Sequence, residues 1–246
     1  MNFSNNTVLI TGGASGIGLS LASHFVQNAS TVIICGRNKD KLEEAKGKHP
    51  QITTYVCDVA NTDERISMFK WISSEFPKLN ILVNNAGIQR RGLQLMQEHA
   101  WETLKEEITI NLEAPIHLSM LFIPQLIKQE NPAIVNVTSG LAFVPLSIAP
   151  IYSATKAALH SFTLSLRQQL IDSPISVIEI IPPAVNTDLG GKGLHTHGVD
   201  VHEFTNAIVK QLKSGQVDAS YGFATESSQA SREQLDLIFK RMNQRR

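Results

Sequence analysis

The sequence predicts an α/β fold in a single domain, built as a doubly wound parallel β-sheet with helices on both faces. Short runs rich in β-branched residues alternate along the chain with longer amphipathic stretches at helical spacing. The short runs are apolar throughout, which is typical of parallel strands covered on both faces. A chain of 246 residues with 42% hydrophobic content suits one such unit.

The first elements are an apolar run at residues 7–10, a glycine-rich turn ending at Gly18, and a helical pattern. Gly12, Gly16 and Gly18 favour a tight turn, close approach to a pyrophosphate and close helix packing, and the helix N-terminus faces the anion. Three residues separate Gly12 from Gly16, so the spacing differs from the common dinucleotide fingerprint.

Five further runs are predicted as strands, at residues 31–35, 52–57, 81–83, 133–137 and 175–181. Helical patterns lie between them, including one long helix expected over residues 100–128. After the sixth strand, residues 186–203 are rich in glycine and are predicted to form a mobile substrate loop. A C-terminal helix over 231–246 has an apolar stripe that we expect to pack on the body or on a neighbouring subunit.

Composition excludes several partner classes. Lys plus Arg equals Asp plus Glu at 22 each, so neither nucleic acid nor an anionic membrane is an expected partner. No stretch approaches the roughly 20 apolar residues needed to span a bilayer. The first six residues lack the features of a signal peptide, so we expect a cytoplasmic protein. Cys35 and Cys57 lie in apolar runs and are interpreted as buried, reduced thiols without a function.

Three histidines of the substrate loop, His195, His197 and His202, raise the question of a metal site. No cysteine or carboxylate cluster completes such a site, so we expect no metal and interpret the three as exposed lid residues.

Tyr152 and Lys156 are four residues apart in a segment that is predicted to be helical, so both lie on one helical face. A cation beside a phenol favours the phenolate and lowers a pKa that is ordinarily about 10. The pair therefore predicts general acid–base chemistry. By itself, such a pair is also typical of a solvated helix face.

Four motifs in order give this pair its context: the glycine turn, Asn84-Asn-Ala-Gly87, Ser139, and Tyr152 with Lys156. Together they resemble the classical short-chain dehydrogenase/reductase family over essentially the whole chain. The resemblance implies a Rossmann-type fold, with Asn111, Ser139, Tyr152 and Lys156 as the catalytic residues. Residues 182–193 further resemble a poorly characterised bacterial subgroup linked to teichoic acid D-alanylation genes.

In the mechanism that this resemblance implies, hydride moves between nicotinamide and a carbon bearing oxygen. Tyr152 would exchange a proton with that oxygen, and Ser139 would hydrogen-bond it. Lys156 would lower the pKa of Tyr152 and hold the cofactor ribose. Pro115, four residues after Asn111, lacks an N–H, so the Asn111 carbonyl is free to accept from a water. A simple bend in the helix is the alternative reading.

Cofactor choice depends on the end of the second strand, where NAD enzymes usually place an acidic side chain. Here Gly36 and Arg37 occupy that place, which resembles the NADP-preferring pattern. NAD, with Arg37 as a solvated loop residue, is the alternative. By resemblance Asp58 would hold the adenine amino group, while Val185 and Thr187 would hold the carboxamide. The cofactor-binding residues that the resemblance implies are Gly12, Ser15, Gly16, Ile17, Gly18, Arg37, Asp58, Val59, Asn85, Gly87, Tyr152, Lys156, Val185 and Thr187.

The predicted function is an NADP-dependent oxidoreductase that acts on a rather apolar carbonyl or secondary alcohol. Phe143, Val144, Pro145 and Leu146 suggest an apolar substrate wall, although buried packing would explain them equally. The alternatives are a dinucleotide-dependent epimerase or dehydratase, and a non-catalytic nucleotide sensor. The family commonly pairs two helices, so we expect a homodimer or homotetramer, with the stripe Leu159, Phe162 and Leu166 facing either a partner or the sheet.

Overall fold

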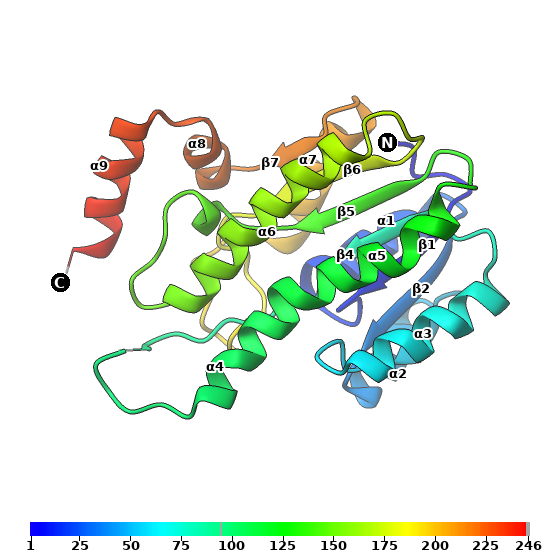
Figure 1. Cartoon of the computed structure of the whole chain (residues 1–246), viewed down its shortest axis with the longest axis horizontal. Coiled ribbons are helices and arrows are strands. Elements are labelled where there is room, and N and C mark those ends of the chain that lie inside the picture. Colours follow the sequence, from blue (N-terminus) through cyan, green and yellow to red (C-terminus); the bar gives the residue numbers. More distant parts are fainter. Residues whose placement is uncertain (94, 245–246) are drawn as a thin grey trace.

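Seven parallel strands form the centre of the molecule, in the order β3-β2-β1-β4-β5-β6-β7 (Figure 1). The computed structural model describes residues 1–93 and 95–244. The sheet is doubly wound, because the strand order runs outward in both directions from the neighbouring pair β1 and β4. The strands are β1 Thr7–Thr11, β2 Thr31–Gly36, β3 Thr53–Val56, β4 Ile81–Asn84, β5 Ala133–Val137, β6 Ser176–Ile181 and β7 Asp218–Ser220.

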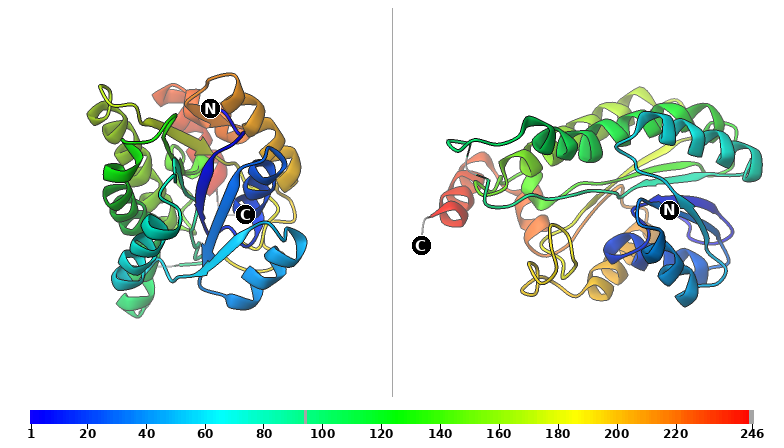
Figure 2. Two further views of the ribbon diagram at one scale, coloured as in Figure 1. Left: turned by 90° about the vertical axis from the view of Figure 1, so that its right-hand side faces the viewer. Right: turned by 90° about the horizontal axis from the view of Figure 1, so that it is seen from below.

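Helices cover both faces of this sheet, as Figure 2 shows. On one face, α1 (Gly16–Gln27), α2 (Lys39–Lys48) and α7 (Val201–Lys213) pack their apolar residues on the strands. On the other face lie α3 (Thr62–Glu75), α5 (Ala114–Leu126) and α6 (Pro150–Gln169). The remaining helices are α4 (Trp101–Ile108), α8 (Phe223–Gln229) and α9 (Arg232–Asn243).

The strands form where the sequence places unbroken apolar runs. Alternate side chains of β1 point to opposite faces, so that Val8 and Ile10 join one buried cluster and Leu9 joins the other. This two-sided burial confirms the predicted doubly wound α/β fold. The short strand β7 was not among the predicted strands, because three residues carry too little periodicity to reveal it.

One nearly straight helical stretch spans α4 and α5, as predicted, but it contains a π-helical turn over Thr109–Glu113. This turn lies immediately before Pro115, which has no N–H to donate to an α-helical partner. A π-turn accommodates that missing donor and is common at functional sites. The turn places Asn111 on the buried side, with no exposed surface.

The ends of the substrate loop and of the C-terminal helix differ from those predicted. Helix α7 begins at Val201, because the Asp200 carboxylate accepts from the backbone N–H groups of His202 and Glu203 and so caps the helix. The loop after β6 therefore ends at residue 200 rather than 203. The C-terminal helix α9 ends at Asn243, and residues 245 and 246 of the expected helix lie outside the described residues.

Helix α9 packs beside the segment that follows β5, at the end of the molecule far from the N-terminus (Figure 1). The Asn243 side chain accepts from the Ser147 N–H and donates to the Pro145 carbonyl. None of the helices that the structure describes is both long and apolar enough to cross a membrane. Cys35 and Cys57 are free and buried, and burial raises the pKa of both thiols.

Candidate functional site

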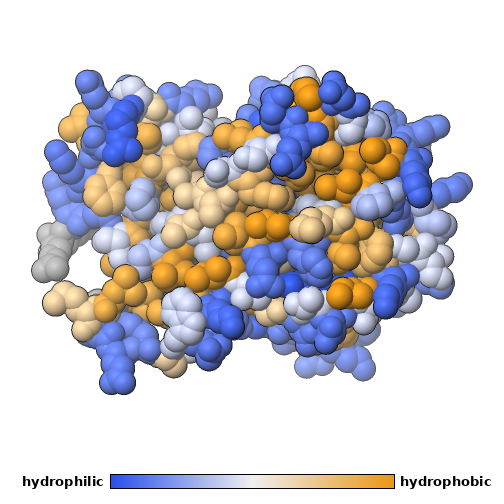
Figure 3. All heavy atoms as spheres, viewed as in Figure 1, coloured by the Kyte–Doolittle hydropathy of each residue, from blue (hydrophilic) through white to orange (hydrophobic). Residues whose placement is uncertain are grey.

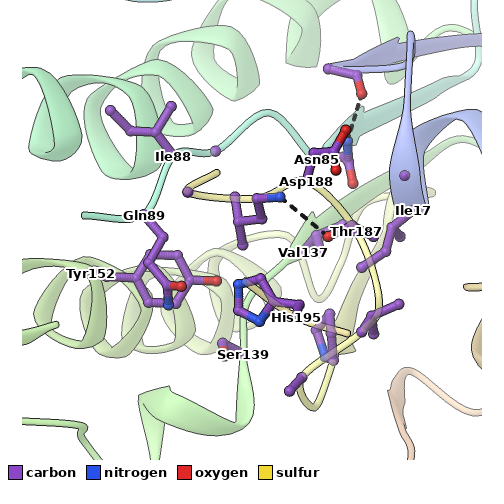
Figure 4. A pocket seen from close by; sticks show the side chains of 18 of the residues that line it. Ile17, Asn85, Ile88, Gln89, Val137, Ser139, Tyr152, Thr187, Asp188 and His195 are labelled. Carbon is purple, nitrogen blue, oxygen red and sulfur yellow. Dashed lines mark hydrogen bonds between the residues drawn. The ribbon is translucent and has the colours of Figure 1, made fainter. Parts of the chain in front are cut away.

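A cavity of about 810 Å³ opens at the carboxyl ends of the central strands, where the strand order reverses between β1 and β4. This is the position at which open α/β sheets bind their ligands. Its lining comes from the glycine turn, the ends of β2, β4 and β5, the start of α6, and the loop after β6. Figure 4 shows how side chains from these separate segments converge.

The glycine turn forms one end of this cavity. Gly16 has a φ of +54°, and a Cβ at Gly18 would lie 2.5 Å from the Gly12 carbonyl oxygen, so side chains are excluded at both positions. Ser15 precedes α1 without capping it through its side chain. The N–H groups of the first turn of α1 therefore remain available to an anion, and this end of the cavity fits a pyrophosphate.

Arg37 also lines the cavity, at the carboxyl end of β2, together with Asn38 and Lys41 of the following segment. Its guanidinium donates to Glu106 of α4 at 2.9 Å, and Glu106 accepts from Arg90 at 2.5 Å as well. Both guanidinium groups hold the pKa of Glu106 below its usual range. Arg37 is thus neither free nor simply solvated in the ligand-free protein.

Tyr152 and Ser139 meet in the middle of the cavity. Tyr152 lies in the first turns of α6, and Ser139 follows β5 and accepts from the Leu141 N–H at 3.1 Å. The pKa of Tyr152 is raised to about 12, chiefly by burial and to a smaller extent by Glu107, while the Ser139 hydrogen bond and Arg91 act in the opposite direction. The pKa is therefore raised and not lowered, contrary to the expectation from the spacing to Lys156, because burial is the largest effect.

Lys156 lies one turn further along α6, and its Nζ is 5.7 Å from the centre of the Tyr152 ring. The ammonium donates to the Val137 carbonyl at 2.7 Å, and of the dashed lines in Figure 4 this is the one that ends beside the label Val137. Burial lowers the pKa of Lys156 to about 8, and Glu107 acts against this shift. The same helical face thus presents the phenol and the amine to the cavity, as the spacing predicted.

Asn111 does not line the cavity but lies behind it. Its side chain accepts from the Ile88 N–H, donates to the Ile88 carbonyl, and donates to the Thr155 hydroxyl. These contacts tie the π-turn to the segment after β4 and to α6. Asn111 therefore fixes the distance between two segments of the site. One begins at the end of β4 and contains the motif Asn84–Gly87, and the other is α6, which carries Tyr152.

Most of the cofactor-binding residues suggested by the sequence do line the cavity, but three do not. Gly18, Asp58 and Val59 are absent from the lining formed by the described residues. The Asp58 carboxylate accepts from the Ala60 N–H, and the Val59 carbonyl accepts from Arg65. The residues that line it are Gly12, Ser15, Gly16, Ile17, Arg37, Asn85, Gly87, Tyr152, Lys156, Val185 and Thr187.

The predicted apolar substrate wall is wrong for most of its members. Val144 is fully buried in the protein, and the Phe143 ring packs on His160 with ring centres 4.7 Å apart. Leu146 does line the cavity. Apolar residues that the sequence did not suggest for this wall also line the cavity, among them Leu141, Phe223 and Met242.

His195 is not the exposed lid residue that the sequence predicted. Its side chain is 4% exposed and lines the cavity on the side of Ser139 and Tyr152 (Figure 4). Among the described residues neither ring nitrogen has a well-formed hydrogen bond, although a weaker interaction with the Leu189 backbone acts to raise the pKa of the ring against the effect of burial. No group of three or more His, Cys, Asp or Glu residues within 1–93 and 95–244 is placed to hold a metal.

Glu107 is a second residue that sequence reasoning missed. It has no exposed surface, its Oε1 accepts from the Arg90 N–H at 3.0 Å, and its Oε2 has no hydrogen-bond partner in the part of the chain that the structure describes. Burial raises its pKa. A single buried acid within a helix carries no recognisable motif, so only the structure could place it near Tyr152 and Lys156.

A family model described as short chain dehydrogenase matches residues 6–197. The chain belongs to the short-chain dehydrogenase family. It is therefore an NAD(P)-dependent oxidoreductase of that family, as the four motifs predicted. The chain is 45% identical to the Bacillus subtilis (strain 168) protein named uncharacterized oxidoreductase DltE, over 99% of this chain and 98% of that protein. This relative supports the subgroup that residues 182–193 indicated.

Solved short-chain dehydrogenases share the fold. A short chain dehydrogenase from Burkholderia cenocepacia J2315, in complex with NADP, has a TM-score of 0.84 and 24% identity, over 97% of this chain and 99% of that chain. A 3-ketoacyl-(acyl-carrier-protein) reductase from Brucella melitensis, complexed with NADH, has a TM-score of 0.81 and 23% identity, over 91% and 100%. At these identities the likeness demonstrates the fold alone.

Proposed function

We propose that the protein is an NADP-dependent oxidoreductase that interconverts a carbonyl compound and a secondary alcohol, with Tyr152 as the general acid and base. The observation that carries this proposal is the convergence of Ser139, Tyr152 and Lys156 on one cavity that also contains the glycine turn. When bound, the nicotinamide supplies or accepts a hydride. The protein's own groups handle the proton and the developing charge on oxygen.

In carbonyl reduction, Tyr152 donates its proton to the substrate oxygen while the Ser139 hydroxyl donates a hydrogen bond to the same oxygen. Because its pKa is raised, the phenol of Tyr152 carries its proton at neutral pH, so the proton that reduction consumes is in place. Lys156 contributes a cation at the same helical face and further N–H donors for ribose hydroxyls. Asn111 positions α6 and the segment after β4 around them.

NADP is the proposed cofactor because the end of β2 offers cations and no carboxylate of its own. Arg37 and Lys41 line the cavity there, and Gly36 occupies the place where an acidic residue would select NAD. The Arg37 side chain is 57% exposed, and an exposed ion pair such as that with Glu106 contributes about 0–1 kcal/mol. A charge-assisted contact to phosphate, at about 1.5–3 kcal/mol, is stronger and can replace it.

Mixing the protein with NADPH and a panel of ketones, while following the loss of reduced-nicotinamide absorbance, tests the proposed reaction. Tyr152→Phe removes only the phenolic oxygen, so turnover should fall by roughly 10²-fold or more while the dissociation constant for NADPH changes little. Lys156→Ala should lower the turnover and also weaken the binding of NADPH. A Tyr152→Phe enzyme that reduces ketones at the parent rate would show that another group donates the proton.

A further inference from the structure

The lining of the whole cavity carries an excess of positive charge. Among the described lining residues there are five lysines and arginines and a single carboxylate, Asp188. Two of the five, Arg37 and Arg90, are neutralised by Glu106. Lys156 belongs to the proposed acid–base group, and Lys41 lies with Arg37 at the end of β2. Arg91 remains to be explained.

Arg91 faces the site with most of its hydrogen-bonding capacity unused. Its Nε donates to the Gln89 side chain at 2.9 Å, and within the described residues no carboxylate pairs with its guanidinium. Gln89 is 4% exposed and is itself part of the cavity wall next to Tyr152 (Figure 4). This contact leaves the terminal nitrogens of Arg91, which have the fork geometry that matches a carboxylate.

His195 supplies a second, independent observation at the same place. Its ring is 96% buried, lines the cavity, and has two nitrogens without a hydrogen-bond partner in the described structure. A buried polar group without a partner is costly, so such a group in the wall of a binding cavity points to a ligand atom that completes it.

The charge of Arg91 reaches both His195 and Tyr152. It contributes to lowering the pKa of His195, after burial, and it favours the phenolate of Tyr152. The Arg91 guanidinium thus lies close enough to the space beside the proton donor to interact electrostatically with both groups. An anion in that space would interact favourably with the Arg91 guanidinium.

We infer that the substrate carries a carboxylate, which Arg91 and His195 bind while its carbonyl oxygen lies at Ser139 and Tyr152. This inference rests on the proposed oxidoreductase function and narrows its substrate to oxo-carboxylates and the corresponding hydroxy acids. In the reduction, the carbonyl carbon accepts a hydride from NADPH and the oxygen accepts a proton from Tyr152, giving the hydroxy acid and NADP⁺. The carboxylate itself is unchanged.

Matched pairs of acids and their methyl esters test this inference, because an ester keeps the shape and loses the charge. Pyruvate, acetoacetate and levulinate place the carboxylate at increasing distances from the carbonyl. With the parent protein, kcat/KM for at least one acid should exceed that for its ester by about 10- to 100-fold, the range expected for a charge-assisted pair. In Arg91→Gln the acid-to-ester ratio should fall to near one, and Arg91→Lys should restore part of it.

Lys192→Ala is the matched control, because Lys192 is an exposed cation of the same loop as His195 and lies outside the cavity lining. It should keep the parent ratio. An equal loss in Lys192→Ala and Arg91→Gln would mean that net charge, and not a specific contact, sets the preference, and this would overturn the inference. An ester turned over as well as its acid by the parent would overturn it too, with the proposed oxidoreductase function intact.

If the parent reduced no acid and no ester, the proposed function would fail, and a binding measurement would still decide the carboxylate site. Isothermal titration of 3-hydroxybutyrate and its methyl ester into the protein, alone and with NADP, needs no turnover. Binding of the acid at least about tenfold tighter than the ester in the parent, and equal binding in Arg91→Gln, would support the site. Equal or undetectable binding of both compounds to the parent would overturn it.

Discussion

At the residue scale, Tyr152 illustrates how burial and charge compete. The four-residue spacing to Lys156 puts a cation on the same helical face, which by itself would lower the pKa of the phenol. The structure adds burial and the carboxylate of Glu107, and both raise that pKa. The balance leaves a protonated phenol at neutral pH, which suits carbonyl reduction better than alcohol oxidation before a cofactor binds.

Arg37 decides the cofactor prediction at the same scale. Arg37→Ala removes the guanidinium that we expect to pair with the 2′-phosphate, so the dissociation constant for NADPH should rise by about 10- to 100-fold. NADH has no phosphate at that position, so its dissociation constant should change little. Gly36→Asp should shift the preference towards NADH, because a carboxylate repels the 2′-phosphate and accepts from a 2′-hydroxyl. Fluorescence titration of both cofactors measures these constants.

Lys39→Ala is a suitable control for Arg37→Ala, because Lys39 begins α2, is exposed, and is not part of the cavity lining. It removes the same charge from the same region and should leave both constants near the parent values. Equal losses for NADPH and NADH in Arg37→Ala, or a parent that already prefers NADH, would assign Arg37 to its ion pair with Glu106 alone.

At the element scale, helix α6 is tied to strand β6 by a partly buried pair of His160 and Glu179. Glu179 of β6 has no exposed surface, and both of its carboxylate oxygens lie about 3 Å from the His160 Nδ1, at 3.0 and 2.9 Å. The Thr138 hydroxyl donates to the same carboxylate at 2.6 Å. Because α6 also carries Tyr152 and Lys156, this pair helps to fix the helix that presents them.

His160→Ala should destabilise the protein by about 1.5–3 kcal/mol, the range for a hydrogen bond to a charged group, because Glu179 keeps only Thr138 as a donor. The hydrogen bond to Glu179 raises the pKa of His160 above its ordinary value of 6.5. The charged contribution is therefore complete below pH 6.5 and is lost as the pH rises through the folded-state pKa.

Urea unfolding followed by circular dichroism between about pH 5 and pH 8 measures this effect, since histidine titrates in that range. The difference in free energy of unfolding between parent and His160→Ala should shrink as the pH rises. A double-mutant cycle with Glu179→Gln isolates the coupling free energy between His160 and Glu179. A difference that grows with pH, or a coupling near zero, would contradict the assignment.

At the scale of the whole molecule, apolar side chains gather along the side formed by α5 and α6 (Figure 3). The predicted stripe is not the one exposed, because Leu159 and Leu166 are buried and Phe162 is partly buried in the core. The large apolar residues that are exposed on these two helices, among those the structure describes, are Met120 and Leu164. The sequence did not single out either of them.

We expect this side to be the contact between copies in a homo-oligomer. Met120 and Leu164 are 65% and 44% exposed, and their replacement by lysine in one double variant should convert the oligomer to monomers, because an unpaired charge is costly in a desolvated interface. Sedimentation velocity measures the mass. Val217→Lys, a change at an exposed apolar residue before β7, is the control and should stay oligomeric. A monomeric parent would refute the expectation.

Much of the fold could be predicted from the sequence because its determinants are local. Unbroken apolar runs gave six of the strands, and the glycine turn and the spacing of Tyr152 and Lys156 depend on residues that are neighbours in the chain. Pro115 likewise indicated an irregularity in the long helix, and a π-turn lies immediately before it. Such signals survive without knowledge of what each element packs against.

The sequence by itself therefore determined the family, the doubly wound sheet and the candidate acid–base residues, whereas only the tertiary structure decided how the substrate end is built. His195, Glu107 and Arg91 carry no local pattern, and their burial and direction follow from contacts between segments that are distant in the chain. The same contacts bury Val144 and bring Met242 of α9 to the cavity. The apolar periodicity of a segment predicts that one face of its helix or strand is buried. It does not predict which residues cover that face, and the free energy of burial depends on those residues.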